Sequence, residues 1–241
     1  MIVVIGCPSY RPPEGAGPDG VGGMAAAVAS AAAADGGQVQ LVGRVGDDAA
    51  GDALVVALGG AGVGHAAMLR DPGRPTPILV ADAAAAEDDT LADLRAGAAL
   101  AEAILGDEPG EAALPTTGEV VLPEGPDERP RLEAADIELA LRYLPELRVI
   151  VAAEPLGEAS ARVVADEAAG AGAQVIAIVA PGTNTPEVLA GATVLEAPPS
   201  DPGGAFARLV GDFAAALDGG ASAAEAFRAA AARVGWEIAS N

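Results

Sequence analysis

The sequence has no lysine, and its 241 residues include one cysteine, Cys7, and one histidine, His65. Without lysine there is no Walker-type phosphate-binding lysine and no Schiff-base chemistry. One cysteine cannot form a disulfide within the chain, and one Cys with one His cannot complete a zinc site. A Ser-His-Asp triad would need His65, which we expect to lie in a turn after a helix, so we do not assign it a catalytic role.

Aromatic residues and positive charge are also scarce. Aromatic residues make up 2% of the chain against 51% apolar residues, so we expect a core of Ala, Val and Leu. Thirteen arginines face 35 acidic residues, which gives a net charge of −22. Such a surface repels nucleic acid and anionic membranes, and we expect it to bind neither. The start MIVVIG resembles a strand rather than a charged leader, so we expect a cytoplasmic protein.

Strand and helix signals alternate along most of the chain. Short apolar runs predict strands at 2–5, 39–42, 78–81, 119–122, 149–152, 174–179 and 193–195. Longer patterns predict helices at 24–34, 49–60, 83–104, 134–144, 158–169, 186–189, 205–217 and 222–234. This alternation is typical of parallel strands joined by right-handed crossovers, and we interpret residues 1–241 as one α/β domain. The Gly/Pro/Glu-rich stretch 106–130 is expected to be a surface excursion.

The stretch LVGRVGDDAAGDALVVALGGAGV at 41–63 combines a strand end, a Gly/Asp turn and a helix. It resembles the corresponding loop and helix of the PfkB/ribokinase family of carbohydrate kinases. The resemblance implies a ribokinase-like three-layer α/β/α sandwich with a mostly parallel sheet. We expect Asp47 and Asp48 to cap the helix; in the family this loop also shapes the sugar pocket.

Further segments are similar to the same family. Gly22–Gly23 before a small-residue helix resembles its GGxxxN segment, and Glu154 at a strand end resembles a glutamate that contacts sugar. The resemblance therefore implies a ligand pocket near Gly22, Gly23, Asp47 and Glu154. The segment 201–207 aligns with the family signature DTxGAGD, whose amides at a helix start hold transferred phosphate.

The signature is altered where the family places its general base. The last Asp of that signature falls on Ala207, whose methyl group cannot accept a proton, and the preceding glycine is Phe206. We expect the benzyl group of Phe206 to crowd the phosphate-binding amides. Asp201 or Asp212 could substitute for the base. For anion binding the sequence leaves the amides of Gly204 and Ala205, with Arg44 and Arg208 as cations, although each arginine has many carboxylates available as partners.

Sugar-binding and lid features are reduced as well. The Asn of GGxxxN falls on Ala27, and only the Pro/Gly loop at 8–23 stands where the family inserts a β-lid. We expect the lid to be reduced or absent, which hinders the exclusion of water from a bound substrate.

These observations favour a degenerate carbohydrate kinase homologue without phosphotransfer activity. It would keep a vestigial small-molecule pocket or bind a protein partner, with no catalytic residue, cofactor or metal assigned. The alternative is an active sugar or nucleoside kinase that uses ATP and Mg²⁺ with Asp201 or Asp212 as base. A third hypothesis is a structural subunit paired with a complete kinase. The resemblance also leaves a homodimer open.

Overall fold

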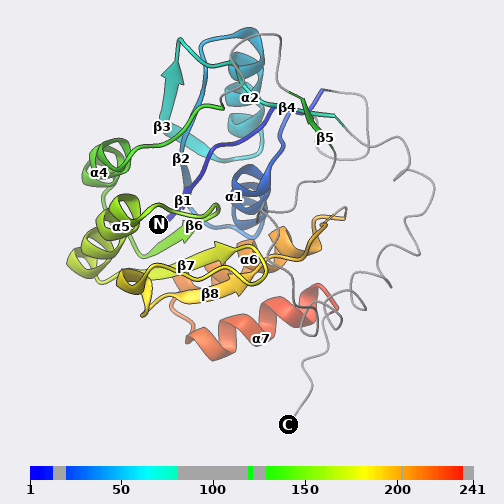
Figure 1. Cartoon of the computed structure of the whole chain (residues 1–241). Coiled ribbons are helices and arrows are strands. Elements are labelled where there is room, and N and C mark those ends of the chain that lie inside the picture. Colours follow the sequence, from blue (N-terminus) through cyan, green and yellow to red (C-terminus); the bar gives the residue numbers. More distant parts are fainter. Residues whose placement is uncertain (13–19, 81–118, 122–128, 202, 236–241) are drawn as a thin grey trace.

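A computed structural model describes residues 1–12, 20–80, 119–121, 129–201 and 203–235. Its centre is a six-stranded sheet in the order β3-β2-β1-β6-β7-β8, and every pair of neighbouring strands is parallel (Figure 1). The strands are β1 (Ile2–Ile5), β2 (Val39–Gly46), β3 (Gly64–Asp71), β6 (Val149–Ala152), β7 (Gln174–Val179) and β8 (Thr193–Glu196). The most buried strands, β1 and β6, are runs of Ile, Val and Ala without polar residues, as expected for strands covered on both faces.

Helices cover both faces of this sheet. One apolar core joins it to α1 (Met24–Ala34), α2 (Ala49–Gly60), α6 (Ala205–Asp218) and α7 (Ala223–Arg233). A second core joins the opposite face to α4 (Ala134–Tyr143), α5 (Glu158–Ala171) and the 3₁₀ helix η2 (Glu187–Leu189). The predicted three-layer α/β/α sandwich is therefore confirmed. The last helix, α7, begins with a capping box between Ser222 and Glu225.

Small residues let α1 and α6 approach each other closely. A Cβ atom added at Gly211 of α6 would lie 2.6 Å from the Cβ of Ala31 on α1, which leaves no space for any side chain. Each alanine of α1 buries little area. Because these side chains are small, however, the backbones of the two helices lie close together and pack densely.

Two sequence predictions about the region 43–71 are wrong. The second strand does not end at Val42 but continues through Gly46, pairing with β3. His65 does not lie in a turn but in β3, an edge strand that the sequence analysis missed although it contains the short apolar run at 66–69. Its ring lies 3.4 Å from the carbonyl oxygen of Val63.

A separate two-stranded antiparallel sheet pairs β4 (Ile78–Val80) with β5 (Glu119–Val121). It lies against the segment after β1, where isolated bridges join Ser9 to Gly22 and Tyr10 to Ile78. The predicted helix at 83–104 and most of the predicted excursion at 106–130 lie outside the described residues. The reduced or absent lid therefore stays a prediction.

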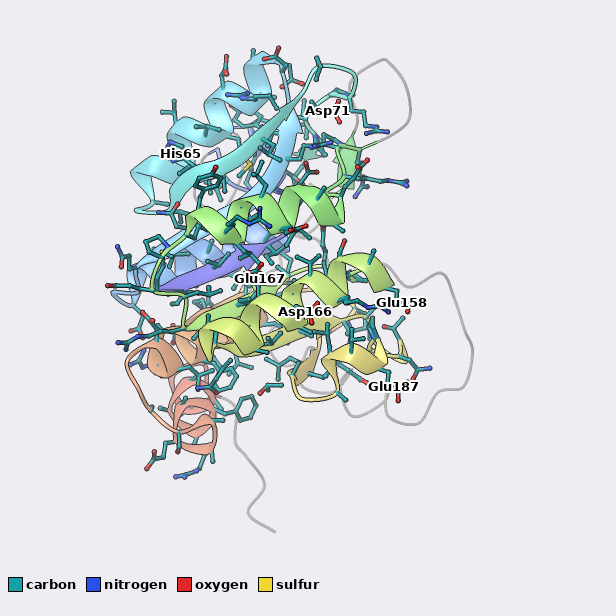
Figure 2. All side chains as sticks on the ribbon, turned by 90° about the vertical axis from the view of Figure 1, so that its left-hand side faces the viewer. His65, Asp71, Glu158, Asp166, Glu167 and Glu187 are labelled. Carbon is teal, nitrogen blue, oxygen red and sulfur yellow. The ribbon has the colours of Figure 1, made fainter. Side chains whose placement is uncertain are left out.

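Helices α4 and α5 lie side by side over one face of the sheet, and this face is acidic. Figure 2 shows Glu158, Asp166 and Glu167 along α5, with Glu187 nearby on η2. Within the described residues, no helix is both long and apolar enough to cross a membrane.

Candidate functional site

The carboxyl ends of β1 and β6 open onto one edge of the sheet. Ile5 of β1 stands opposite Ala152 of β6, and the amide of Ala153 donates a hydrogen bond of 2.9 Å to the carbonyl of Ile5. Two residues beyond each strand come Cys7 and Glu154, which are joined by a hydrogen bond of 3.3 Å from the Cys7 amide to Glu154 Oε2. Ligands of open α/β sheets bind at this edge.

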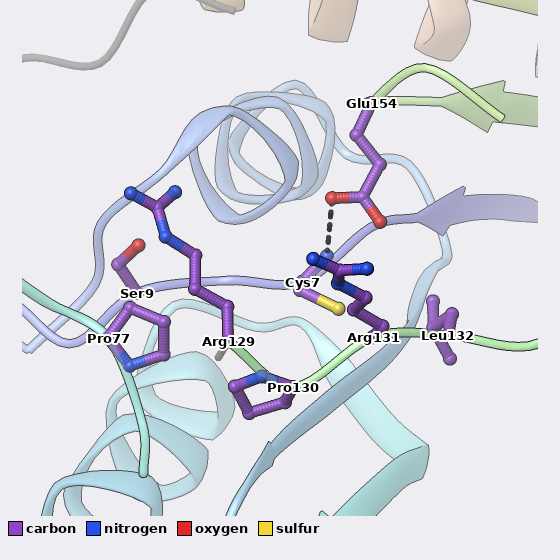
Figure 3. Close-up of a pocket in the computed structure, with 8 residues that line it drawn as sticks. All are labelled: Cys7, Ser9, Pro77, Arg129, Pro130, Arg131, Leu132 and Glu154. Carbon is purple, nitrogen blue, oxygen red and sulfur yellow. Dashed lines mark hydrogen bonds between the residues drawn. The ribbon is translucent and has the colours of Figure 1, made fainter. Parts of the chain in front are cut away.

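A pocket of about 380 Å³ lies here, between the chain segments that leave β1 and β6 and the segment that leads into α4 (Figure 3). Its lining residues are Cys7, Ser9, Pro77, Arg129, Pro130, Arg131, Leu132 and Glu154. The volume falls within the range of small-molecule sites. Glu154 also borders a second hollow of about 100 Å³ beside β7. The structure thus places Glu154, a predicted ligand-binding residue, in a pocket.

Burial perturbs the two ionisable groups beside the hydrogen bond. Burial raises the pKa of the Glu154 carboxyl, while the Cys7 hydrogen bond and the positive charge of Arg129 oppose the rise. Burial, and then the negative charge of Glu154, raise the pKa of the Cys7 thiol to about 12. Cys7 therefore remains a neutral thiol at physiological pH and is not a nucleophile.

The other predicted ligand-binding residues do not line this pocket. Gly22 and Ser9 exchange two backbone hydrogen bonds of 2.9 Å, and Gly23, with φ of 82°, begins α1. Both glycines therefore hold the segment that carries Ser9. Asp47 is exposed beyond the end of β2, and Asp48 alone caps α2, accepting hydrogen bonds from the amides of Gly51 and Thr76.

The N-terminus of α6 is satisfied by a carboxylate of the chain itself. Asp201 is 7% exposed, and its two oxygens accept hydrogen bonds of 3.1 Å from the amides of Phe206 and Ala207. The amide of Gly204 donates to the carbonyl of Asp201. A helix N-terminus attracts anions, and here the anion is an aspartate. Three amides at this terminus, those of Gly204, Phe206 and Ala207, already have acceptors within the chain.

The Phe206 side chain differs from the sequence expectation. It does not crowd the phosphate-binding amides; its ring is 3% exposed and belongs to the apolar core shared by the sheet, α1 and α6. Ala207 is also buried, at 3%.

The predicted anion-binding arginines and the proposed substitute base, Asp212, contact other groups of the protein. Arg44 forms an ion pair of 2.8 Å with Asp136, and Arg208 donates to the carbonyl of Gly203. Asp212 lies 3.5 Å from Arg233, which also pairs with Asp35 at the C-terminal end of α1. Because α1 begins at the carboxyl edge and rises about 1.5 Å per residue, this cluster lies about 16 Å along the helix from that edge. Asp212 therefore does not join the pocket.

Four polar or ionisable residues of the pocket were not predicted from the sequence, namely Cys7, Ser9, Arg129 and Arg131. Both arginines lie at the border of a segment interpreted as a surface excursion, and no local pattern reveals their proximity to the end of β1. Among the residues described, no group of three His, Cys, Asp or Glu side chains could hold a metal ion.

Comparison with known proteins agrees with this architecture. A family model described as pfkB family carbohydrate kinase matches residues 16–114. The structure is similar to Sa239, with a TM-score of 0.60 and 12% identity, over 99% of this chain and 95% of that one. A PfkB protein from Polaromonas sp. JS666 gives 0.58 and 16%, over 98% and 95% of the two chains. A ribokinase from Arabidopsis thaliana, complexed with ribose and ATP, gives 0.56 and 18%, over 97% and 90%.

No curated protein sequence matches the chain. At such low identity the solved structures establish the fold, and the family model adds the sequence signal that the Gly/Asp loop and helix at 41–63 carry. The chain therefore has the ribokinase-like α/β fold, and its residues 16–114 match the family model of the pfkB carbohydrate kinases.

Proposed function

We propose that this chain is a PfkB-family protein that does not transfer phosphate and that binds a small molecule in the pocket beside Glu154. The single observation that carries the first half is the pair of hydrogen bonds from the amides of Phe206 and Ala207 to the Asp201 carboxylate. A phosphoryl group would have to displace a buried carboxylate from the helix terminus and would meet its negative charge.

The absence of a base at Ala207 supports the same conclusion. Its methyl group is buried in the core, so no proton acceptor stands at the position that the resemblance assigns to the general base. Asp201 is a poor substitute because both of its oxygens bind backbone amides. Asp212 is a poor substitute because it pairs with Arg233 away from the pocket. No described contact favours the active-kinase alternative, in which ATP and Mg²⁺ would bind.

The pocket supports the second half of the proposal. Glu154 is partly buried at the carboxyl edge, and carboxylate oxygens accept hydrogen bonds from hydroxyl groups. Retention of a buried carboxylate whose pKa is raised costs stability, and such groups cluster at functional sites. A small hydroxylated molecule is the ligand class that this carboxylate suits.

Calorimetric titration with ATP and Mg²⁺, at low and high salt, tests the loss of phosphate binding. We expect no saturable heat at millimolar nucleotide and no transfer of labelled phosphate to a panel of sugars and nucleosides. Asp201→Asn and Glu154→Gln variants serve as controls, because phosphorylation that survives both changes comes from a contaminant. Phosphorylation by the unaltered chain that either variant abolishes would overturn the proposal.

A further inference from the structure

The arginines of the pocket differ from most described arginines of this acidic chain. Most described arginines bind a carboxylate or a backbone carbonyl of the protein, as Arg44, Arg70, Arg74, Arg142, Arg148, Arg162, Arg208 and Arg233 do. In the part of the chain that the structure describes, Arg129 and Arg131 form no ion pair or hydrogen bond of this kind, although both line the pocket.

The pocket is therefore a positive site within a negative protein. Two arginines and one carboxylate, that of Glu154, line it, in a chain whose net charge is −22. The positive charge of Arg129 acts on Glu154 without reaching ion-pair distance. A free anion is repelled by the protein as a whole, so a site that holds one needs concentrated local positive charge.

We infer that the pocket binds a hydroxylated anion, with Arg129 and Arg131 holding its phosphate or carboxylate group and Glu154 accepting a hydroxyl. This inference rests on the proposed small-molecule function of the same pocket. Guanidinium groups bind both anion types in a bidentate manner, and two of them neutralise a phosphate monoester. Ser9, whose hydroxyl can donate or accept, lies on the same wall as Arg129 (Figure 3).

The size of the pocket limits the ligand. A volume of about 380 Å³ lies near the lower end of the range of roughly 300–1,000 Å³ that is typical of small-molecule sites. A pentose or hexose carrying one anionic group is a ligand of suitable size.

Calorimetry with three probes tests the inference. Ribose 5-phosphate and ribose differ only by the phosphate group, and gluconate presents a carboxylate on a polyol. We expect at least one of the two anions to bind at least tenfold more tightly than ribose, and its affinity to fall at 0.5 M salt. The comparison of the two anions identifies which acidic group the arginines select.

Arginine variants test the assignment. Arg129→Gln and Arg131→Gln should each weaken anion binding about tenfold, and the double variant about a hundredfold. Arg142→Gln, which removes the same charge from an exposed pair on α4, should leave binding unchanged. Thermal melting of each variant verifies its fold.

Three outcomes would overturn the inference. They are ribose binding as tightly as the anions, arginine variants that bind the anion normally, and no heat from any probe at 10 mM. If ribose binds as tightly as the anions, the proposed small-molecule function still stands. The titration with ATP and Mg²⁺ tests the loss of phosphate transfer separately.

Discussion

Two regions at the carboxyl edge of the sheet differ in how their polar groups are satisfied. We call the pocket beside the central strands β1 and β6 the open end, and the N-terminus of α6 the closed end. Beside β1 and β6, the charged groups of Arg129, Arg131 and Glu154 line a pocket and do not pair with one another. At the N-terminus of α6, the amides of Phe206 and Ala207 are closed by Asp201. At the open end, charged side chains remain available to a ligand. At the closed end, the helix amides already bind a carboxylate of the chain itself. The proposed loss of phosphate transfer therefore does not require the loss of ligand binding.

The strongest test of the closed end is to restore the family's base. Ala207→Asp should lower the free energy of unfolding by about 3–5 kcal/mol, because it buries a second carboxylate beside Asp201 without a partner. Urea unfolding measures the loss. Ala205→Asp, at the half-exposed start of the same helix, should change stability by less than about 1 kcal/mol. The comparison would be contradicted if the Ala207→Asp variant were as stable as the parent and also phosphorylated a sugar.

Removing the internal carboxylate is the next largest change. Asp201→Ala should cost about 2 kcal/mol, since it leaves two buried helix amides without acceptors. Asp47→Ala is the matched control, because its exposed side chain should matter by less than about 0.5 kcal/mol. Equal denaturation midpoints for the two variants would show that Asp201 does not hold the terminus.

At the open end, neutralising Glu154 should stabilise the protein. The folded carboxyl has a raised pKa because it is buried, so it holds its proton more tightly than the unfolded chain does. The parent is therefore expected to lose stability as pH rises above the ordinary value near 4.5, whereas Glu154→Gln lacks this loss. We expect the stability of the variant relative to the parent to increase as the pH rises from 4.5 to 7.5. If the difference in the free energy of unfolding between the two proteins stays constant across that range, burial does not destabilise the ionised Glu154 carboxylate.

The smallest expected effect concerns the thiol in the same pocket. The thiol pKa rises from 9.0 to about 12 on folding, so deprotonation favours the unfolded state above pH 9. Relative to Cys7→Ala, the parent should lose about 0.8 kcal/mol between pH 8 and pH 9.5. Unfolding curves of both proteins at the two pH values give this difference directly. If the two proteins lose stability in parallel, the thiol is not buried beside the carboxylate.

Most elements of the fold could be predicted because their apolar runs are clear. The strands β1, β6 and β7 have the predicted bounds, and α1 and α2 also begin and end as expected. The edge strand β3 was missed because the apolar run AAML within GHAAMLRD lacks the β-branched and aromatic residues that favour strands. The end of β2 was misjudged because Gly43 and Gly46 favour turns locally, whereas pairing with β3 keeps them extended.

The site was only partly predictable for a different reason. The signature at 201–207 located the helix terminus and the missing base, but not the hydrogen bonds of the Asp201 carboxylate, which depend on the loop's path. The arginines could not be found, because more than 120 residues separate them from Cys7 and only the fold brings them together. Glu154 could be found, since a polar residue directly after a buried strand marks the carboxyl edge.

The pairing of β1 has a consequence for synthesis. Its first partner, β2, begins at Val39, but its second, β6, begins at Val149. At a ribosomal rate of about 5–20 residues per second, one edge of this wholly apolar strand lacks its partner for roughly 7–30 s. Pairs so distant in sequence also slow folding after release. The nascent chain thus exposes an aggregation-prone edge for seconds, and chaperone demand should depend on how quickly residues 149–152 arrive.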